Sequence, residues 1–181
     1  MTPPVVLAAA LAMAVSAGAA AGGEDCVRHV PVAVFPTRVA TIRSTSFHPV
    51  SANEATEEVV FTTGERLQIR NWGCESFVLT FRYESKALPA TGDARAWHER
   101  AAEVLERLAR LEPHSPFDFP LAARQLRRAL RTPAALRLQE DIAVEGDGVE
   151  FLQARVSVAG GGALKSGGGG YVEFQLAKGP L

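Results

Sequence analysis

The feature that most constrains the fold is a switch in the spacing of apolar residues, from every second residue to helical spacing and back. Residues 58–85 alternate between apolar and polar side chains, residues 93–131 place apolar residues three or four apart, and residues 136–177 alternate again. Alternation is typical of strands, and the wider spacing is typical of helices. Because strands and helices fall into separate blocks, we predict an α+β fold. It has an antiparallel sheet of about five to six strands, with two helices inserted mid-chain and packed on one face.

The first strand block, residues 54–85, reads as a β-meander. The stretch from Ser76 to Ser85 is its clearest part, because four aromatic or aliphatic side chains share one face: Phe77, Leu79, Phe81 and Tyr83. Such a strand packs one face on a core and leaves the other wetter. The preceding residues 22–53 contain several prolines, which disfavour central strands and helices. We therefore expect an extended arm there, with one possible strand over residues 38–45.

The middle block predicts two helices. The first spans residues 93–111, with Asp93 or Thr91 as its N-cap and Pro113 beyond its end. The second, shorter helix spans about residues 121–131. We expect the first helix to lay its apolar stripe across the sheet, and His98, which faces away from the stripe that contains Trp97, to lie on the surface.

The last block predicts strands over residues 136–144, 149–159 and 171–177, joined by a glycine-rich loop at residues 160–170. This loop differs from a nucleotide-binding P-loop, which requires Gly directly before Lys-Ser, whereas Leu164 precedes Lys165 here. It also joins two strands, so no helix N-terminus faces a phosphate. We interpret it as a hairpin loop and expect no nucleotide partner.

The N-terminal segment, residues 1–21, has the composition of a secretory signal peptide. It has an uncharged apolar stretch from Val5 to Val15 and small residues that end at Ala21. We expect cleavage there, which leaves residues 22–181 as one exported domain, periplasmic or extracellular, with no stable membrane span. Since no Lys or Arg precedes the apolar stretch, an uncleaved membrane anchor is the alternative. The Ala-, Arg- and Gly-rich, Lys-poor composition is typical of a bacterial chain.

The chain has two cysteines, Cys26 and Cys74. In an oxidising compartment such a pair most often forms a disulfide. The bridge would close a loop of about 50 residues and stabilise the fold by roughly 3–4 kcal/mol on the chain-entropy model. We therefore predict that Cys26 and Cys74 tie the N-terminal arm to the sheet.

Two features are candidate partner contacts. The second predicted helix carries an arginine stripe, which consists of Arg124, Arg127, Arg128 and Arg131. Guanidinium groups bind carboxylates and phosphates, so the stripe suggests an anionic envelope component or an acidic protein; a solvated helix face is the alternative. Trp72, in the turn before Cys74, is either a binding anchor or a packing residue. The net charge of −1 argues against nucleic acid.

No residue pattern in the chain indicates a catalytic, metal or cofactor site, so we expect no cofactor. Enzymatic activity stays open, and a non-enzymatic exported module that binds a protein or envelope component is favoured. One alternative is a small hydrolase of the cell envelope whose site is assembled from scattered residues. The other is a membrane-anchored structural protein, if the leader is not cleaved.

Overall fold

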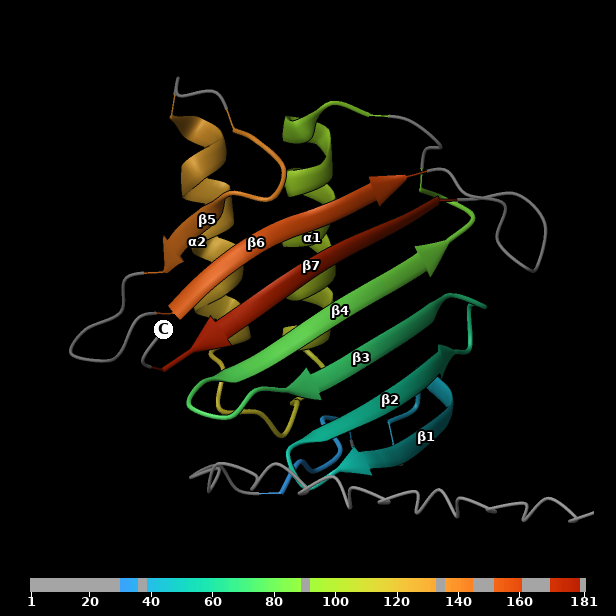
Figure 1. The fold of residues 1–181 in the computed structure, drawn as a ribbon. Helices are drawn as coiled ribbons and strands as arrows, with labels where there is room; N and C mark the ends of the chain where they lie inside the picture. The colour runs from blue at the N-terminus through green and yellow to red at the C-terminus, as the bar shows by residue number, and fades with distance from the viewer. Residues whose placement is uncertain are drawn as a thin grey trace, which may run out of the picture.

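Among the residues that the structure describes, a seven-stranded antiparallel sheet with two helices on one face forms the fold (Figure 1). The computed structural model describes residues 30–35, 39–88, 92–132, 136–144, 152–160 and 170–179. The strands are β1 (Ile42–Ser51), β2 (Glu54–Phe61), β3 (Arg66–Trp72), β4 (Phe77–Ser85), β5 (Asp141–Val144), β6 (Leu152–Gly160) and β7 (Gly170–Lys178). The helices are α1 (Ala94–Ala109) and α2 (Phe119–Arg131). The predicted α+β class with an antiparallel sheet is confirmed.

The order of the strands in the sheet is β1-β2-β3-β4-β7-β6-β5. Strands β1 to β4 therefore form one meander and β5 to β7 form a second. The last strand of the chain, β7, pairs with β4 in the middle of the sheet. The helix pair links the two halves. Antiparallel neighbours throughout the sheet are consistent with the segregation of strands and helices along the sequence.

The expected count of five to six strands was wrong, because the sheet has seven. The arm contributes one strand, but not over the residues 38–45 where a possible strand was expected: residues 42–51 form β1 at the sheet edge and pair with β2 along most of their length. Pro49 lies within β1, which an edge position allows because one side of an edge strand needs no ladder hydrogen bonds. The strand expected at 136–144 begins only at Asp141.

The core lies between the helices and the inner face of the sheet. Phe81 is at its centre, with its ring stacked on Phe174 at 5.0 Å between centroids and edge-on to Phe119 of α2 at 5.6 Å. From α1, Trp97, Leu105 and other members of the predicted apolar stripe are buried in the same cluster. The alternating pattern therefore identified the inner face of the meander correctly.

Both helices begin at aspartate caps. The Asp93 carboxylate accepts a hydrogen bond from the Ala96 backbone N–H at 2.8 Å, and Asp118 accepts one from Leu121 at 2.7 Å. An N-cap of this kind satisfies a backbone donor that the helix cannot. Asp118 starts α2 two residues earlier than the sequence predicted, since Pro120 is compatible with the first turn of a helix.

The N-terminal arm covers the part of the inner face near β2. Val34 and Phe35 are 2% and 1% exposed and belong to the core cluster. The carbonyl of Val34 also accepts a hydrogen bond from the backbone N–H of His114, in the connector between the helices, at 2.7 Å. Val34 and Phe35 of the arm are thus held between the sheet and the α1–α2 connector.

Candidate functional site

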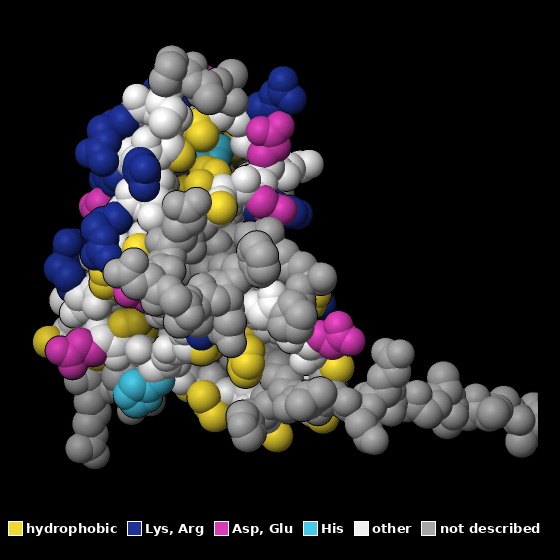
Figure 2. All heavy atoms as spheres, turned by 90° about the vertical axis from the view of Figure 1, so that its left-hand side faces the viewer, with side chains coloured by type: hydrophobic (Ala, Val, Ile, Leu, Met, Phe, Trp, Pro, Cys, Tyr) yellow, Lys and Arg dark blue, Asp and Glu magenta, His cyan; other side chains and the backbone are white. Residues whose placement is uncertain are grey.

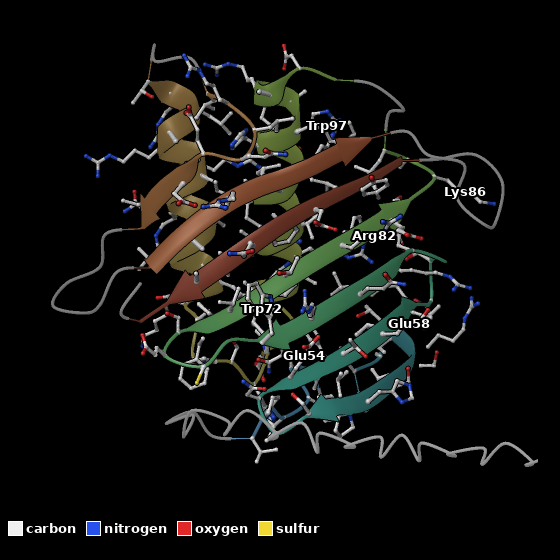
Figure 3. The ribbon with its side chains drawn as sticks, viewed as in Figure 1. Glu54, Glu58, Trp72, Arg82, Lys86 and Trp97 are labelled. Carbon is white, nitrogen blue, oxygen red and sulfur yellow. The ribbon has the colours of Figure 1, made fainter. Side chains whose placement is uncertain are left out.

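The sheet face opposite the helices carries a continuous polar surface (Figure 3). Within the described residues no helix covers this face, which we call the open face. Most of its side chains belong to the polar half of each alternating strand, as the sequence pattern predicts, and Val60 and Val78 share the face with them. Glu58 and Arg82, for example, project from it, while Val59 and Phe81, their neighbours in the chain, are fully buried.

Cross-strand register aligns these polar side chains into two rows that cross the strands. Row A comprises Ser46, Glu58, Gln68, Arg82 and Glu173, each directly opposite the next on the neighbouring strand. Row B comprises His48, Thr56, Arg70, Thr80, Gln175, Arg155 and Asp141, one residue from each of the seven strands. Residues two apart on one strand are separated by about 6.8 Å, so the rows run side by side.

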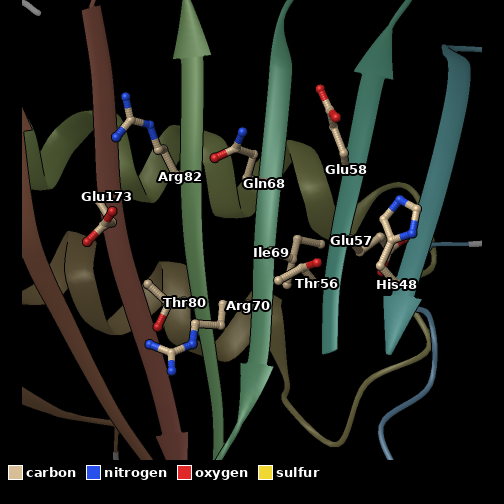
Figure 4. A pocket seen from close by; sticks show the side chains of 10 residues that line it. All are labelled: His48, Thr56, Glu57, Glu58, Gln68, Ile69, Arg70, Thr80, Arg82 and Glu173. Carbon is tan, nitrogen blue, oxygen red and sulfur yellow. The ribbon is translucent and has the colours of Figure 1, made fainter. Parts of the chain in front are cut away.

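A groove of about 530 Å³ lies between the two rows, across β1, β2, β3, β4 and β7 (Figure 4). The outward side chains that line it are all polar: His48, Thr56, Glu58, Gln68, Arg70, Thr80, Arg82 and Glu173. Glu57 and Ile69, which also line it, are buried with their side chains on the core side. Four strand spacings of about 4.8 Å give the groove a length of about 19 Å.

Three of the four long charged side chains that border the groove, Arg82, Glu58 and Arg70, lean away from it. From row A, Arg82 binds Glu84 with 2.8 Å between Nε and Oε1, and its guanidinium lies 3.9 Å from the Tyr171 ring centroid. Glu58, also in row A, binds Arg66 at 3.2 Å on the same side.

From row B, the Arg70 side chain leans to the opposite side. It binds Glu54 at 2.8 Å and lies 4.9 Å over the ring of Trp72. Figure 4 shows Arg82 and Glu58 turned to one side and Arg70 to the other. These outward contacts leave the space between the rows to Thr56, Gln68 and Thr80, with Glu173 at one end and His48 at the other.

Trp72, a predicted partner contact, stands beside this groove. It is half-buried, and its indole N–H donates to the Thr80 hydroxyl at 3.1 Å. Because Arg70 also covers its ring, the structure supports the packing interpretation of Trp72. It positions two groove residues rather than offering an open ring.

The predicted arginine stripe lies on α2, in the helix layer, away from the open face. Figure 2 shows Lys and Arg side chains gathered along one edge of the molecule. Arg127 is paired: its Nε and Nη2 donate to the two oxygens of Glu106 on α1, at 2.9 and 3.2 Å. Arg124, Arg128 and Arg131 are exposed. The structure therefore does not bring Trp72 and the stripe together in one site.

Two predictions fall partly outside the described residues. Cys74 is half-buried between β3 and β4, but Cys26 lies outside the described residues, as does the leader at 1–21. The disulfide therefore stays a prediction. Of the glycine-rich loop, only its ends at Gly160 and Gly170 are described, and they terminate β6 and begin β7.

One buried carboxylate, Glu57, was missed from the sequence. It is 3% exposed, and its two oxygens accept hydrogen bonds from the backbone N–H groups of Val34 at 2.6 Å and Phe35 at 3.0 Å. Burial raises the pKa of Glu57, although the two N–H donors favour its charged form. Its position could have been found, because Glu57 shares the parity of the buried Val59 and Phe61 along β2.

The expectation that His98 lies on the surface was wrong, since it is fully buried. Its Nδ1 donates to the carbonyl of Ala94 at 2.6 Å, and its Nε2 has no partner within the described part of the chain. The reason is that α1 packs against α2 as well as against the sheet. The buried surface of α1 is therefore wider than the stripe that contacts the sheet.

A second polar cluster joins α1 to the turn between β2 and β3. Arg107 donates to the hydroxyl of Tyr83 at 2.7 Å and to Glu65 at 3.1 Å, and its guanidinium lies 4.4 Å from the Phe61 ring centroid. Burial raises the pKa of Tyr83 to about 12. Burial would raise the pKa of Glu65 too, but hydrogen bonds from Thr63 and Arg107 lower it overall. The polar groups of this cluster form hydrogen bonds with one another, which indicates that the cluster has a structural role.

Among the described residues, no group of three or more His, Cys, Asp or Glu side chains is placed to hold a metal ion. The same part of the chain has no helix with the length and apolar character needed to span a membrane. Comparison with protein families, with characterised protein sequences and with solved structures found no significant match.

Proposed function

We propose that this chain is an exported, non-enzymatic binding module that holds a polar protein or envelope component on the open face of its sheet. The observation that carries this proposal is the groove between rows A and B. Binding sites are concave surfaces with a few placed polar groups, and this one is shallow, long and lined by polar side chains. Export rests on the leader-like segment at residues 1–21.

The groove favours binding over the hydrolase alternative. Its carboxylates on the open face are Glu58 on β2 and Glu173 on β7, with β3 and β4 between them. Three strand spacings separate their backbones by about 14 Å. Glycosidase carboxyl pairs are about 5 to 9.5 Å apart, so this pair does not have the geometry for acid–base hydrolysis of a glycosidic bond.

A pair of variants tests the proposal. Gln68→Trp, at an exposed strand position in the middle of the groove, fills the groove with a side chain that strands accommodate well. Arg128→Gln, on the exposed face of α2, is the control. Immobilised protein of each form, purified from its own host as processed there, is incubated with solubilised envelope fractions and washed at several salt concentrations.

The proposal predicts that the wild type and Arg128→Gln retain the same partner in stoichiometric amount and that Gln68→Trp loses it. If Gln68→Trp retains the partner while Arg128→Gln loses it, the α2 stripe carries the interaction and the proposal is wrong. Circular dichroism of both variants verifies that each remains folded.

A further inference from the structure

The groove also restricts the chemistry of its ligand; this inference rests on the proposed function. Its outward side chains include two carboxylates, Glu58 and Glu173, and two guanidiniums, Arg70 and Arg82. Opposite charges therefore balance along the groove. A polyanion would meet the carboxylates and a polycation the guanidiniums, and unfavourable pairs of like charge are costly to hold together. The charge pattern favours a ligand without net charge.

Apart from Glu173 and His48, the side chains left to contact a ligand are uncharged. Arg82, Arg70 and Glu58 are engaged by partners outside the groove. Gln68 and Thr56 are exposed, and within the described residues neither side chain makes a hydrogen bond. An amide offers two donors and an acceptor, and a hydroxyl offers one donor and two lone pairs. Gln68 and Thr56 are therefore suited to bind the hydroxyl groups of a ligand, which both donate and accept hydrogen bonds.

The shape of the groove indicates a linear ligand that crosses the strands. The polar rows border it on both sides for about 19 Å, the span of five strands at about 4.8 Å per spacing. An extended peptide is a poorer fit. Peptides bind sheets by adding a strand at an edge, with pockets that take alternate side chains. This groove lies on the face, and none of its outward side chains is apolar.

From the balanced charge, the free hydroxyl and amide groups and the linear shape, we infer that the ligand is a neutral, linear glycan chain lying between rows A and B. Gln68 and Thr56 bind its hydroxyl groups. Arg70, Arg82 and Glu58, whose partners lie outside the groove, leave its sides open. The α2 arginines have no part in this contact.

The test is isothermal titration calorimetry with the protein as processed by its host. The probes are neutral linear hexasaccharides of glucose, mannose and N-acetylglucosamine, an anionic hexamer of galacturonic acid, and a Gly/Ser peptide of similar length. The variants are Gln68→Ala, which removes the amide, and Gln68→Trp, which fills the groove. Ser44→Ala is the control, because Ser44 is an exposed residue of β1 that does not line the groove.

We expect at least one neutral hexasaccharide to bind the wild type. Gln68→Ala should weaken that binding about 3- to 10-fold, the range expected from the loss of a neutral hydrogen bond. Gln68→Trp should abolish it, and Ser44→Ala should leave it unchanged.

Other results separate this inference from the proposed function. If the anionic hexamer or the peptide binds instead, and Gln68→Trp abolishes that binding, the glycan inference is overturned while the groove keeps its binding role. If no probe binds and Gln68→Trp also retains the envelope partner in the pull-down, both are overturned. A neutral glycan whose binding is insensitive to Gln68→Trp overturns the glycan inference, because it binds elsewhere, and the pull-down then decides the binding role of the groove.

Discussion

Arg82 and Glu84 lie two positions apart on the open face of β4, and their side chains meet at 2.8 Å on the side away from the groove. Tyr171, on the neighbouring strand, stacks under the same guanidinium at 3.9 Å. The pair thus keeps a long cationic side chain out of the space between the two polar rows. The ion pairs of this surface matter for the shape of the groove more than for the stability of the fold.

Removal of this pair should close the groove partly without unfolding the protein. In Glu84→Ala, the Arg82 side chain loses its anionic partner and gains access to the groove, so groove binding should weaken several-fold. The free energy of unfolding should fall by less than about 1 kcal/mol, as for other ion pairs near a surface. Calorimetry and urea denaturation measure the two quantities. A stability loss above about 2 kcal/mol with unchanged binding would show that the pair is purely structural.

Glu57 should give the fold a pH dependence of known sign. Its pKa is raised in the folded state by burial, so the folded protein holds this proton more tightly than the unfolded chain. Its contribution to stability is therefore fully present below its unfolded pKa of about 4.5 and is lost as the pH rises through the folded pKa. Relative to Glu57→Gln, the wild type should become less stable as the pH rises above about 4.5.

Urea denaturation of the wild type and Glu57→Gln from pH 4 to 8 measures this difference. The comparison with Gln cancels the opposing contribution of Glu65, whose pKa is lowered. A difference that is constant with pH would show that Glu57 ionises in the fold as it does in the unfolded chain.

The arm should contribute strongly to stability through Phe35. This side chain is 1% exposed in the core cluster, and truncation of a buried Phe to Ala typically costs about 3–5 kcal/mol. The matched control is Val32→Ala in the same arm, where the side chain is 64% exposed and the change should be within about 0.5 kcal/mol. Chemical denaturation of both variants compares them, and equal small losses would mean that the arm is not docked in solution.

The α2 arginines should divide into one that supports the fold and three that do not. Arg127→Gln removes a two-hydrogen-bond contact with Glu106 and should cost up to about 1 kcal/mol, the upper range for an exposed pair. Arg124→Gln, Arg128→Gln and Arg131→Gln should each change stability by less than about 0.5 kcal/mol. Thermal unfolding of the four variants tests this order, and a large effect of Arg128→Gln would contradict it.

The predicted disulfide between Cys26 and Cys74 can be tested by mass spectrometry. The mass of the unreduced protein should be two hydrogens below that of the reduced protein, and a peptide pair containing both cysteines should be recovered after digestion. Reduction should destabilise the fold by roughly 3–4 kcal/mol if the chain-entropy model holds. Two free thiols in protein from the exported fraction would contradict the pairing.

The local pattern predicted much of the architecture. Alternation over residues 76–85 identified which side chains of β4 face the core, because strand side chains point to opposite faces by parity alone. Asp93 was one of the two predicted N-caps of the first helix, for an equally local reason, and the structure has it as the cap. The strand count was too low because β1 is an edge strand. Its composition resembles that of a loop, and it contains Pro49.

The candidate site itself could not be read from the pattern. Parity places Gln68 and Arg82 on the open face, but only the register puts them directly opposite each other. The pairing of Arg82 with Glu173 joins residues from the two halves of the sheet. The same holds for Glu57, whose partners, the N–H groups of Val34 and Phe35, come from an arm that crosses beneath β2.

The sequence by itself determined where both helices and most of the strands form and which face of the meander is buried, since both follow from the spacing of apolar residues along a few turns or pleats. Only the tertiary structure decided that β7 pairs with β4, that row A and row B lie side by side, and that the arginine stripe and Trp72 are on different layers. Strand pairing and layer packing join residues far apart in the chain. Which strands pair, and in which register, depends on the packing of the whole sheet. A local sequence pattern therefore does not predict it.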